Sequence, residues 1–264
     1  MREQLKQAKR IVVKVGTSTL TYDTGKINYR RIESLTKVLS DLANQGKEIV
    51  LVTSGAIGVG MDKMHLQTRP TAIEEKQAAA AVGQCELMNV YAKFFAEYNH
   101  LIGQILLTPD VIENQSGKEH VTNTFFALMK KGIIPVVNEN DSVAVEEIKF
   151  GDNDTLSAIV AVLVEADLLV ILTDIDGLYD ENPKDHPDAH LIPQVDAITE
   201  TLVQAAGGAG TSRGTGGMYT KVQAARRTME HGISTVICNG SEVDVLYDVL
   251  EGKQVGTLFC GKEE

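Results

Sequence analysis

Short apolar segments alternate along the chain with longer segments in which apolar residues recur at helix spacing. The β-branched run at residues 10–18 is followed by a stretch with apolar residues on one face, at Ile32, Leu35, Val38, Leu39 and Leu42. We expect strands at residues 10–18, 48–55, 102–108, 133–141, 168–174, 234–240 and 255–261. We expect helices near residues 32–42, 71–98, 121–131, 156–164 and 217–231, and a last helix before the final strand.

The predicted strands are almost continuously apolar, which is typical of parallel strands covered by helices on both faces. Strands that alternate with helices predict an α/β fold, here a three-layer αβα sandwich with a mainly parallel central sheet. No linker or repeat interrupts the pattern, so we expect a single domain over residues 1–264. Ligands of such sheets bind beyond the carboxyl ends of the strands, and the polar motifs of this chain lie there.

The amino-acid composition excludes some binding partners and predicts where the protein is located. The 264 residues are 43% hydrophobic, enough for a full core, and 25 basic against 36 acidic residues give a net charge of −11. An acidic chain without a basic patch predicts no nucleic-acid partner. The charged N-terminus and the short apolar runs predict neither a signal peptide nor a membrane span. Three widely separated cysteines, Cys85, Cys238 and Cys260, are typical of reduced thiols, so we expect a cytoplasmic protein.

Two glycine-containing loops follow predicted strands. "KVGTS" at residues 14–18 and "TSGAIGVG" at residues 53–60 lead toward helices, where backbone N–H groups can bind phosphate oxygens. Neither has the GxGxxG spacing of a dinucleotide site. Tight strand-to-helix turns are the alternative explanation for each loop alone, and two such loops on successive strands favour phosphate binding.

Two lysines stand where a positive charge is unfavourable. Lys14 interrupts an apolar strand, and Lys221 falls in the first turns of a helix that a glycine-rich segment precedes, where a cation opposes the helix dipole. A bound anion such as phosphate accounts for both positions. The alternatives are a snorkelling lysine at an edge strand for Lys14 and a solvated surface lysine for Lys221.

Acidic residues gather after two predicted strands. Asp141, Asp152 and Asp154 belong to neighbouring loops that we expect to converge at one sheet edge, where clustered carboxylates require cations between them. Lys14, Lys221, Mg²⁺ or a substrate ammonium group could each serve. Beyond the 168–174 strand, Thr173 and Asp174 enter a turn, for which Asp is also an ordinary residue.

The six histidines fall outside every motif, which leaves aspartates as the only acid–base groups. Phosphoryl transfer to an already ionised carboxylate needs no general base, because its catalysis consists of positioning and charge neutralisation. Transfer to a hydroxyl would require one of the aspartates as base.

Six motifs together resemble the amino-acid kinase family and, within it, the glutamate 5-kinases. They are "VVKVGTS", "VTSGAIGVG", "VVNENDSVAVEEIKFGDNDTLSA", "LLVILTDIDGLY", "GTGGMYTK" and "VGTLF", and they span nearly the whole chain. The resemblance implies ATP-dependent phosphorylation of the γ-carboxylate of L-glutamate to L-glutamyl 5-phosphate, the first step of proline biosynthesis. Mg²⁺ would bridge the ATP phosphates.

The same resemblance implies roles for individual residues. Lys14 and Lys221 would draw the transferring phosphoryl group between them, with Asp154 holding both lysines in place. The glutamate site would consist of Ser54, Asp141 and Asn153. The ATP site would consist of Lys14, Thr173, Asp174, Thr215, Gly216, Gly217, Met218, Tyr219, Thr220 and Lys221. No residue is expected to be a dedicated metal ligand.

Several expectations rest on the family alone. Many members carry a C-terminal PUA domain, and we expect none here because the chain ends at Glu264. Feedback inhibition by proline and a homo-oligomeric state are implied by the resemblance. Two rival functions remain: a sister kinase acting on acetylglutamate or a nucleoside monophosphate, and a non-catalytic amino-acid sensor. Acetylglutamate has no ammonium group, so the acidic loops favour free glutamate.

Overall fold

The computed structural model describes residues 1–22, 24–143, 152–183, 185–207 and 217–261. Its strands are β1 (Arg10–Val15), β2 (Glu48–Val52), β3 (Ile102–Leu107), β4 (Ile134–Glu139), β5 (Leu168–Thr173), β6 (Gln194–Val195), β7 (Ser234–Asn239) and β8 (Thr257–Phe259). Its helices are η1 (Arg2–Gln7), α1 (Thr17–Leu20), α2 (Tyr29–Asn44), α3 (Ala56–Lys63), α4 (Ile73–Glu97), α5 (Pro109–Glu113), α6 (Gln115–Met129), α7 (Asn153–Leu163), α8 (Glu200–Ala205), α9 (Met218–Met229) and α10 (Val245–Leu250). Every strand expected from the apolar pattern is present, within a few residues of its predicted bounds.

The chain divides into two compact units, each described by itself. The first unit contains residues 1–14 and 151–264, and the second contains residues 15–150. The single-domain expectation stays a prediction.

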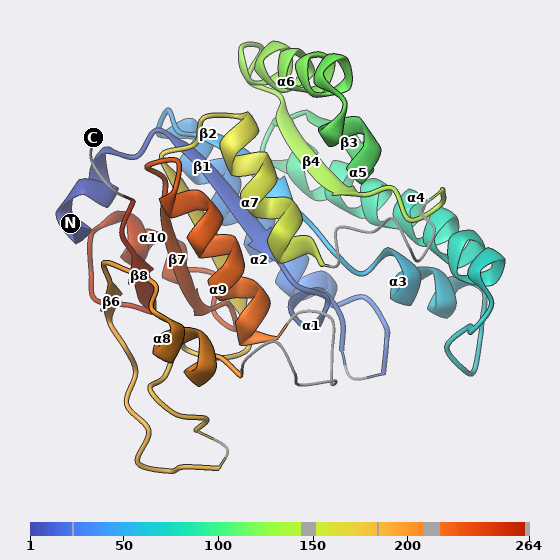
Figure 1. Cartoon of the computed structure of the whole chain (residues 1–264). Helices are drawn as coiled ribbons and strands as arrows, with labels where there is room; N and C mark the ends of the chain where they lie inside the picture. Colours follow the sequence, from blue (N-terminus) through green and yellow to red (C-terminus); the bar gives the residue numbers. More distant parts are fainter. Residues whose placement is uncertain (23, 144–151, 184, 208–216, 262–264) are drawn as a thin grey trace. The chain divides into compact units, whose positions relative to one another are not determined.

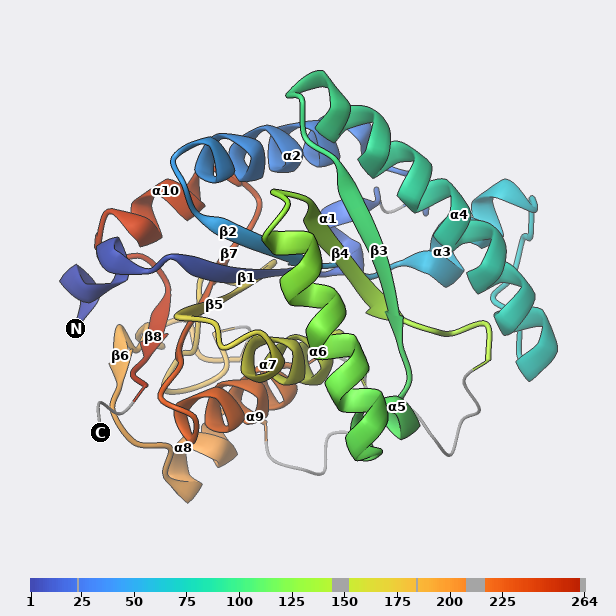
Figure 2. The same cartoon turned by 90° about the horizontal axis from the view of Figure 1, so that it is seen from above.

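In the second unit, three parallel strands follow the order β3-β4-β2. The longest pairing runs from Ile102 opposite Ile134 to Leu107 opposite Glu139. Helices α2 and α4 contact one face of these strands, and α6 contacts β4 from the other face (Figure 2). Both faces of the strands are thus covered, as their continuous apolar sequences require.

In the first unit, β1 neighbours β5, and the order continues β7-β8-β6. Strand β5 is buried along its whole length and pairs in parallel with β7, whereas β8 is antiparallel to β7. Helices α7 and α9 lie side by side on one face, and α10 lies on the other (Figures 1 and 2), in contact with η1. The predicted α/β class with mainly parallel strands is confirmed.

Glycines bring α3 and α4 unusually close in the second unit. A Cβ added to Gly60 would lie 1.8 Å from the carbonyl oxygen of Ala79, and one added to Gly83 would lie 1.8 Å from that of Ala56. Both neighbours are backbone atoms, which cannot rotate away. In the "TSGAIGVG" motif, Gly60 therefore serves helix packing, and Gly55 precedes α3 with a φ of 92°. The phosphate-binding interpretation of this loop stays a prediction.

Among the residues described, no helix combines the length and apolarity that crossing a membrane requires. Cys238 and Cys260 are buried and Cys85 is exposed, and all three are free thiols.

Candidate active site

Three buried charged side chains meet in the first unit. The Nζ atom of Lys14, on β1, lies 2.6 Å from Oδ1 of Asp154, and the Nζ atom of Lys221 lies 3.0 Å from Oδ2 of the same carboxylate. The side chains of the two lysines are only 8% and 7% exposed, and that of Asp154 is fully buried. One carboxylate therefore bridges two ammonium groups that come from different elements. We call these three residues the lysine clamp.

Helix α7 positions the carboxylate of the clamp. Asp152 caps the helix, because its side chain accepts a hydrogen bond of 2.8 Å from the backbone N–H of Thr155. Asn153 and Asp154 then occupy the first two helical positions, where a negative charge is favoured by the helix dipole. Because Asp152 caps the helix, Asp154 is free to pair with the lysines.

Helix α9 supplies the second lysine from its first turn. Gly217 precedes the helix, and the single hydroxyl proton of Thr220 is shared between two acceptors, Oδ2 of Asp154 at 2.9 Å and the carbonyl of Gly217 at 2.8 Å. The N-terminal ends of α7 and α9 therefore lie together, as Figure 1 shows. The carboxylate of Asp154 offsets the unfavourable placement of Lys221 near the positive end of α9.

The electrostatics of the clamp favour an anion. Burial alone would raise the pKa of Asp154, but the two neighbouring ammonium groups outweigh it and hold this pKa below its usual value. With the carboxylate ionised, two positive charges and one negative charge sum to +1 in a site sheltered from water. Buried charge is costly unless it is compensated, so the clamp is suited to hold a phosphate oxygen.

The segment after β5 lies at the carboxyl ends of the strands. Thr173 ends β5 and its hydroxyl donates to Oδ1 of Asp174 at 3.2 Å. Its carbonyl accepts from the backbone N–H of Gly240, which follows β7. Asp176 accepts from the side chain of Asn239 at 2.8 Å. These bonds order the turn that the sequence assigned to a nucleotide site and leave the exposed Asp174 at its surface.

The structure covers part of the predicted ATP segment. Gly217, Met218, Tyr219, Thr220 and Lys221 form the start of α9, where backbone N–H groups are available to an anion. Thr215 and Gly216 lie outside the described residues.

The predicted glutamate residues belong to different units. Asn153 lies in the first unit, whereas Ser54 and Asp141 lie in the second. Their convergence stays a prediction. Asp141 lines a pocket of about 370 Å³ that is formed within the second unit, together with Gln84 and Glu139.

Gln84 and Glu139 did not emerge from the sequence analysis. Gln84 lies on the buried face of α4, one residue after Gly83 and three before Leu87. A polar side chain on an otherwise apolar helix face is the signal that could have identified it.

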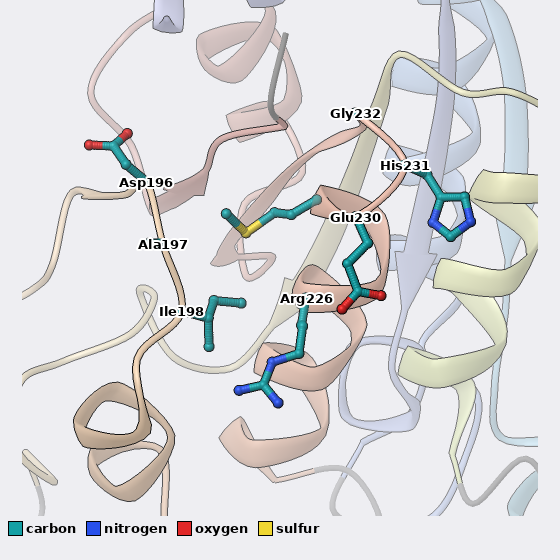
Figure 3. A pocket seen from close by; sticks show the side chains of 8 residues that line it. Asp196, Ala197, Ile198, Arg226, Glu230, His231 and Gly232 are labelled. Atoms are coloured by element: carbon teal, nitrogen blue, oxygen red, sulfur yellow. The ribbon is translucent and has the colours of Figure 1, made fainter. Parts of the chain in front are cut away.

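A cavity of about 930 Å³ in the first unit lies away from the clamp. Figure 3 shows that it is lined by the segment around Ile198 and by the C-terminal end of α9, including Arg226 and Glu230. Lys221 and Met229 are eight positions apart on α9, which corresponds to about 12 Å along a helix. None of the predicted site residues lines this cavity, so the clamp remains the candidate active site.

Within the described part of the chain, no three His, Cys, Asp or Glu side chains are grouped to hold a metal ion. The donors at the clamp are ammonium groups, which attract anions rather than cations.

Comparison with known proteins gives close relatives of similar length. A Glutamate 5-kinase from Clostridium perfringens is 54% identical over 267 residues, which cover 100% of this chain and 99% of that protein. A Glutamate 5-kinase from Enterococcus faecalis is 54% identical and is matched over 98% of this chain and 97% of its own.

Solved structures share the fold at low sequence identity. UMP kinase from Bacillus anthracis matches with a TM-score of 0.65 at 15% identity, covering 97% of each chain. An isopentenyl phosphate kinase from T. acidophilum matches with a TM-score of 0.65 at 17% identity, covering 95% of this chain and 99% of the other. Residues 9–239 match the sequence profile described as the Amino acid kinase family. Because this match spans most of the chain and the close relatives align along their whole length, the chain belongs to the amino acid kinase family.

Proposed function

We propose that this chain catalyses the ATP-dependent phosphorylation of the γ-carboxylate of L-glutamate, giving L-glutamyl 5-phosphate, the first step of proline biosynthesis. Relatives that are 54% identical over essentially their full length are named Glutamate 5-kinase, which supports glutamate as the acceptor. The observation that supports phosphoryl transfer is the buried lysine clamp, in which Lys14 and Lys221 share the single carboxylate of Asp154.

The clamp has the chemistry that this transfer requires. An oxygen of the γ-carboxylate forms a bond to the γ-phosphorus of ATP while the bond between that phosphorus and the β,γ-bridging oxygen breaks, and ADP leaves. Lys14 and Lys221 would neutralise charge on the transferring group, and Asp154 would keep both ammonium groups in position. The acceptor is ionised at neutral pH, so no proton has to be removed from it.

The other proposed site residues would bind the two substrates. The start of α9, with Gly217 to Lys221, would hold phosphate oxygens of ATP through its N–H groups, and Thr173 and Asp174 would contact the nucleotide. In the second unit, the carboxylate of Asp141 would pair with the α-ammonium of glutamate. Ser54 and Asn153 complete the proposed glutamate set.

Mg²⁺ would enter as the complex with ATP. Without a protein carboxylate cluster in the described residues, the phosphate oxygens would supply its ligands, as is common for magnesium at nucleotide sites. From family membership alone we also propose proline as a feedback inhibitor, a homo-oligomeric state and a cytoplasmic location. Inhibition kinetics and sedimentation would test the first two.

The test is ADP release with Mg²⁺–ATP and each of four acceptors: L-glutamate, N-acetylglutamate, L-aspartate and UMP. We expect turnover with L-glutamate, and hydroxylamine should trap its product as a hydroxamate, the reaction of an acyl phosphate. Faster turnover with N-acetylglutamate or UMP would instead identify a sister kinase. No ADP release with any acceptor, combined with measurable glutamate binding, would identify a sensor and overturn the proposal.

A further inference from the structure

The pocket of the second unit contains a buried amide group that the proposed chemistry has not used. The pocket lies between the start of α3, the middle of α4 and the segment that follows β4, and Asp141 is one of its lining residues. Gln84 of α4 also lines the pocket, although this residue is only 8% exposed.

A chain of hydrogen bonds sets the orientation of this amide. The backbone N–H of Glu139 donates to Oδ1 of Asn138 at 2.9 Å, and Nδ2 of Asn138 donates to Oε1 of Gln84 at 2.9 Å. A backbone N–H can only donate, so it assigns the oxygen of Asn138, which in turn assigns the oxygen of Gln84. The Nε2 group of Gln84 is therefore the last group in this series of hydrogen bonds, and it points away from Asn138.

This Nε2 group is a buried donor without a partner among the described residues. An unsatisfied buried donor destabilises a protein, so such groups are rare and call for an explanation. A ligand oxygen in the pocket would satisfy it.

The backbone around Gln84 is closely packed. The neighbouring Gly83 is packed so tightly that a Cβ would lie 1.8 Å from the carbonyl oxygen of Ala56 and 2.5 Å from the backbone nitrogen of Gly60. Ala56 itself lines the pocket. The donor is therefore held on a fixed helix rather than on a mobile loop, as a recognition group should be.

We propose that Nε2 of Gln84 donates a hydrogen bond to the α-carboxylate of the glutamate substrate and so determines specificity for an α-amino acid. The inference rests on the proposed function, in which Asp141 of the same pocket pairs with the α-ammonium. Ammonium and α-carboxylate are attached to one carbon atom, so an acceptor oxygen accompanies the ammonium into this pocket. Gln84 binds substrate and takes no part in the chemical step.

The decisive variant is Gln84→Glu, because it keeps an oxygen to accept the hydrogen bond from Asn138 while it replaces the Nε2 donor with a second oxygen. We expect the KM for glutamate to rise at least 10-fold, with the KM for ATP changed less than 2-fold. If Gln84 served only to support Asn138, this variant would bind glutamate normally. Asn89→Asp is the matched control, since it makes the same amide-to-acid change at an exposed position of the same helix.

A second variant and a second ligand identify which carboxylate is bound. Gln84→Leu should also raise the KM for glutamate at least 10-fold. The inhibition constant of 4-aminobutyrate, which has the ammonium and the reacting carboxylate but no α-carboxylate, should stay within 2-fold of the wild-type value. Equal weakening of both ligands would overturn the assignment to the α-carboxylate.

These experiments distinguish a failure of the role proposed for Gln84 from a failure of the proposed kinase function. Wild-type protein that fails to phosphorylate glutamate would refute the kinase assignment. Wild-type turnover together with an unchanged KM in both Gln84 variants would refute only the role of Gln84. Circular dichroism melts of both variants show whether they are folded, and direct calorimetric binding of glutamate to the folded variants gives the same comparison without turnover.

Discussion

Replacing Asp154 with asparagine tests the central feature of the site, because it removes one charge and almost no volume. The two lysine ammonium groups would remain buried, 2.6 and 3.0 Å from the positions of the former carboxylate oxygens. They would then face a neutral amide and repel each other. We therefore expect Asp154→Asn to weaken both folding and catalysis.

The magnitude follows from these distances. At an effective dielectric constant of about 20, each ion pair at such a separation is worth about 6 kcal/mol of attraction. Desolvation of the buried charges offsets a large part of this, and removal of one partner from a buried ion pair typically destabilises a protein by about 3–5 kcal/mol. For a chain of this size, such a loss corresponds to a melting temperature lower by about 10 °C. The kcat should fall by a factor on the order of 10² or more.

Thermal or urea unfolding at pH 7 and a coupled ADP assay measure the two effects. Asp152→Asn is the matched control, since Asn and Asp are equally good N-caps and this position lies two residues away on the same helix. Asp154→Asn protein with the stability and kcat of Asp152→Asn would refute the reasoning.

The pH dependence of stability gives an independent check. The pKa of Asp154 is lowered in the folded protein, so its ionised form stabilises the fold above the unfolded-state pKa of about 3.9. That stabilisation is lost as the pH falls through the folded-state pKa. The difference in unfolding free energy between wild type and Asp154→Asn should therefore be constant near neutrality and shrink below about pH 4. A difference that is independent of pH down to strong acid would contradict the assignment.

Two further substitutions test packing and chemistry separately. Gly83→Ala should destabilise the protein by about 3 kcal/mol or more, because the new methyl group would meet backbone atoms of α3, whereas Gly58→Ala, which meets nothing within 4 Å, should be neutral or stabilising in urea unfolding. Normal stability of Gly83→Ala would show that α3 and α4 can separate freely. Lys221→Ala should reduce kcat by a factor on the order of 10² or more, while Lys93→Ala at an exposed position should not. Equal activities of these two variants in the ADP assay would show that Lys221 has no role in catalysis.

The sequence by itself determined the order of the elements and the places where chemistry was to be sought. Continuously apolar runs predicted the buried parallel strands, because a strand covered on both faces has no polar face to display. The same apolar run made Lys14 a candidate anion-binding residue, since a charge within such a run needs compensation. Residues 152–154 contain three acceptor side chains, more than a helix start needs, and the structure shows that Asp152 is the cap.

Which charges meet was decided by the tertiary structure. Lys221 and Asp154 are 67 positions apart, and their contact exists because α7 and α9 pack side by side with their N-terminal ends together. The helix and strand propensities of the two segments contain no information about a contact between residues so far apart in the sequence. The role of Gly60 was likewise hidden, because a glycine in a loop motif and a glycine at a close helix contact look the same in a sequence.

Gln84 shows most clearly what the sequence alone could not predict. The alanine-rich stretch before it predicts only a helix, and its partner Asn138 lies 54 positions away on β4. Whether a buried amide is satisfied depends on every atom around it in space. The sequence could therefore name the fold and the clamp residues, but only the packed structure could show that this buried donor has no partner among the described residues.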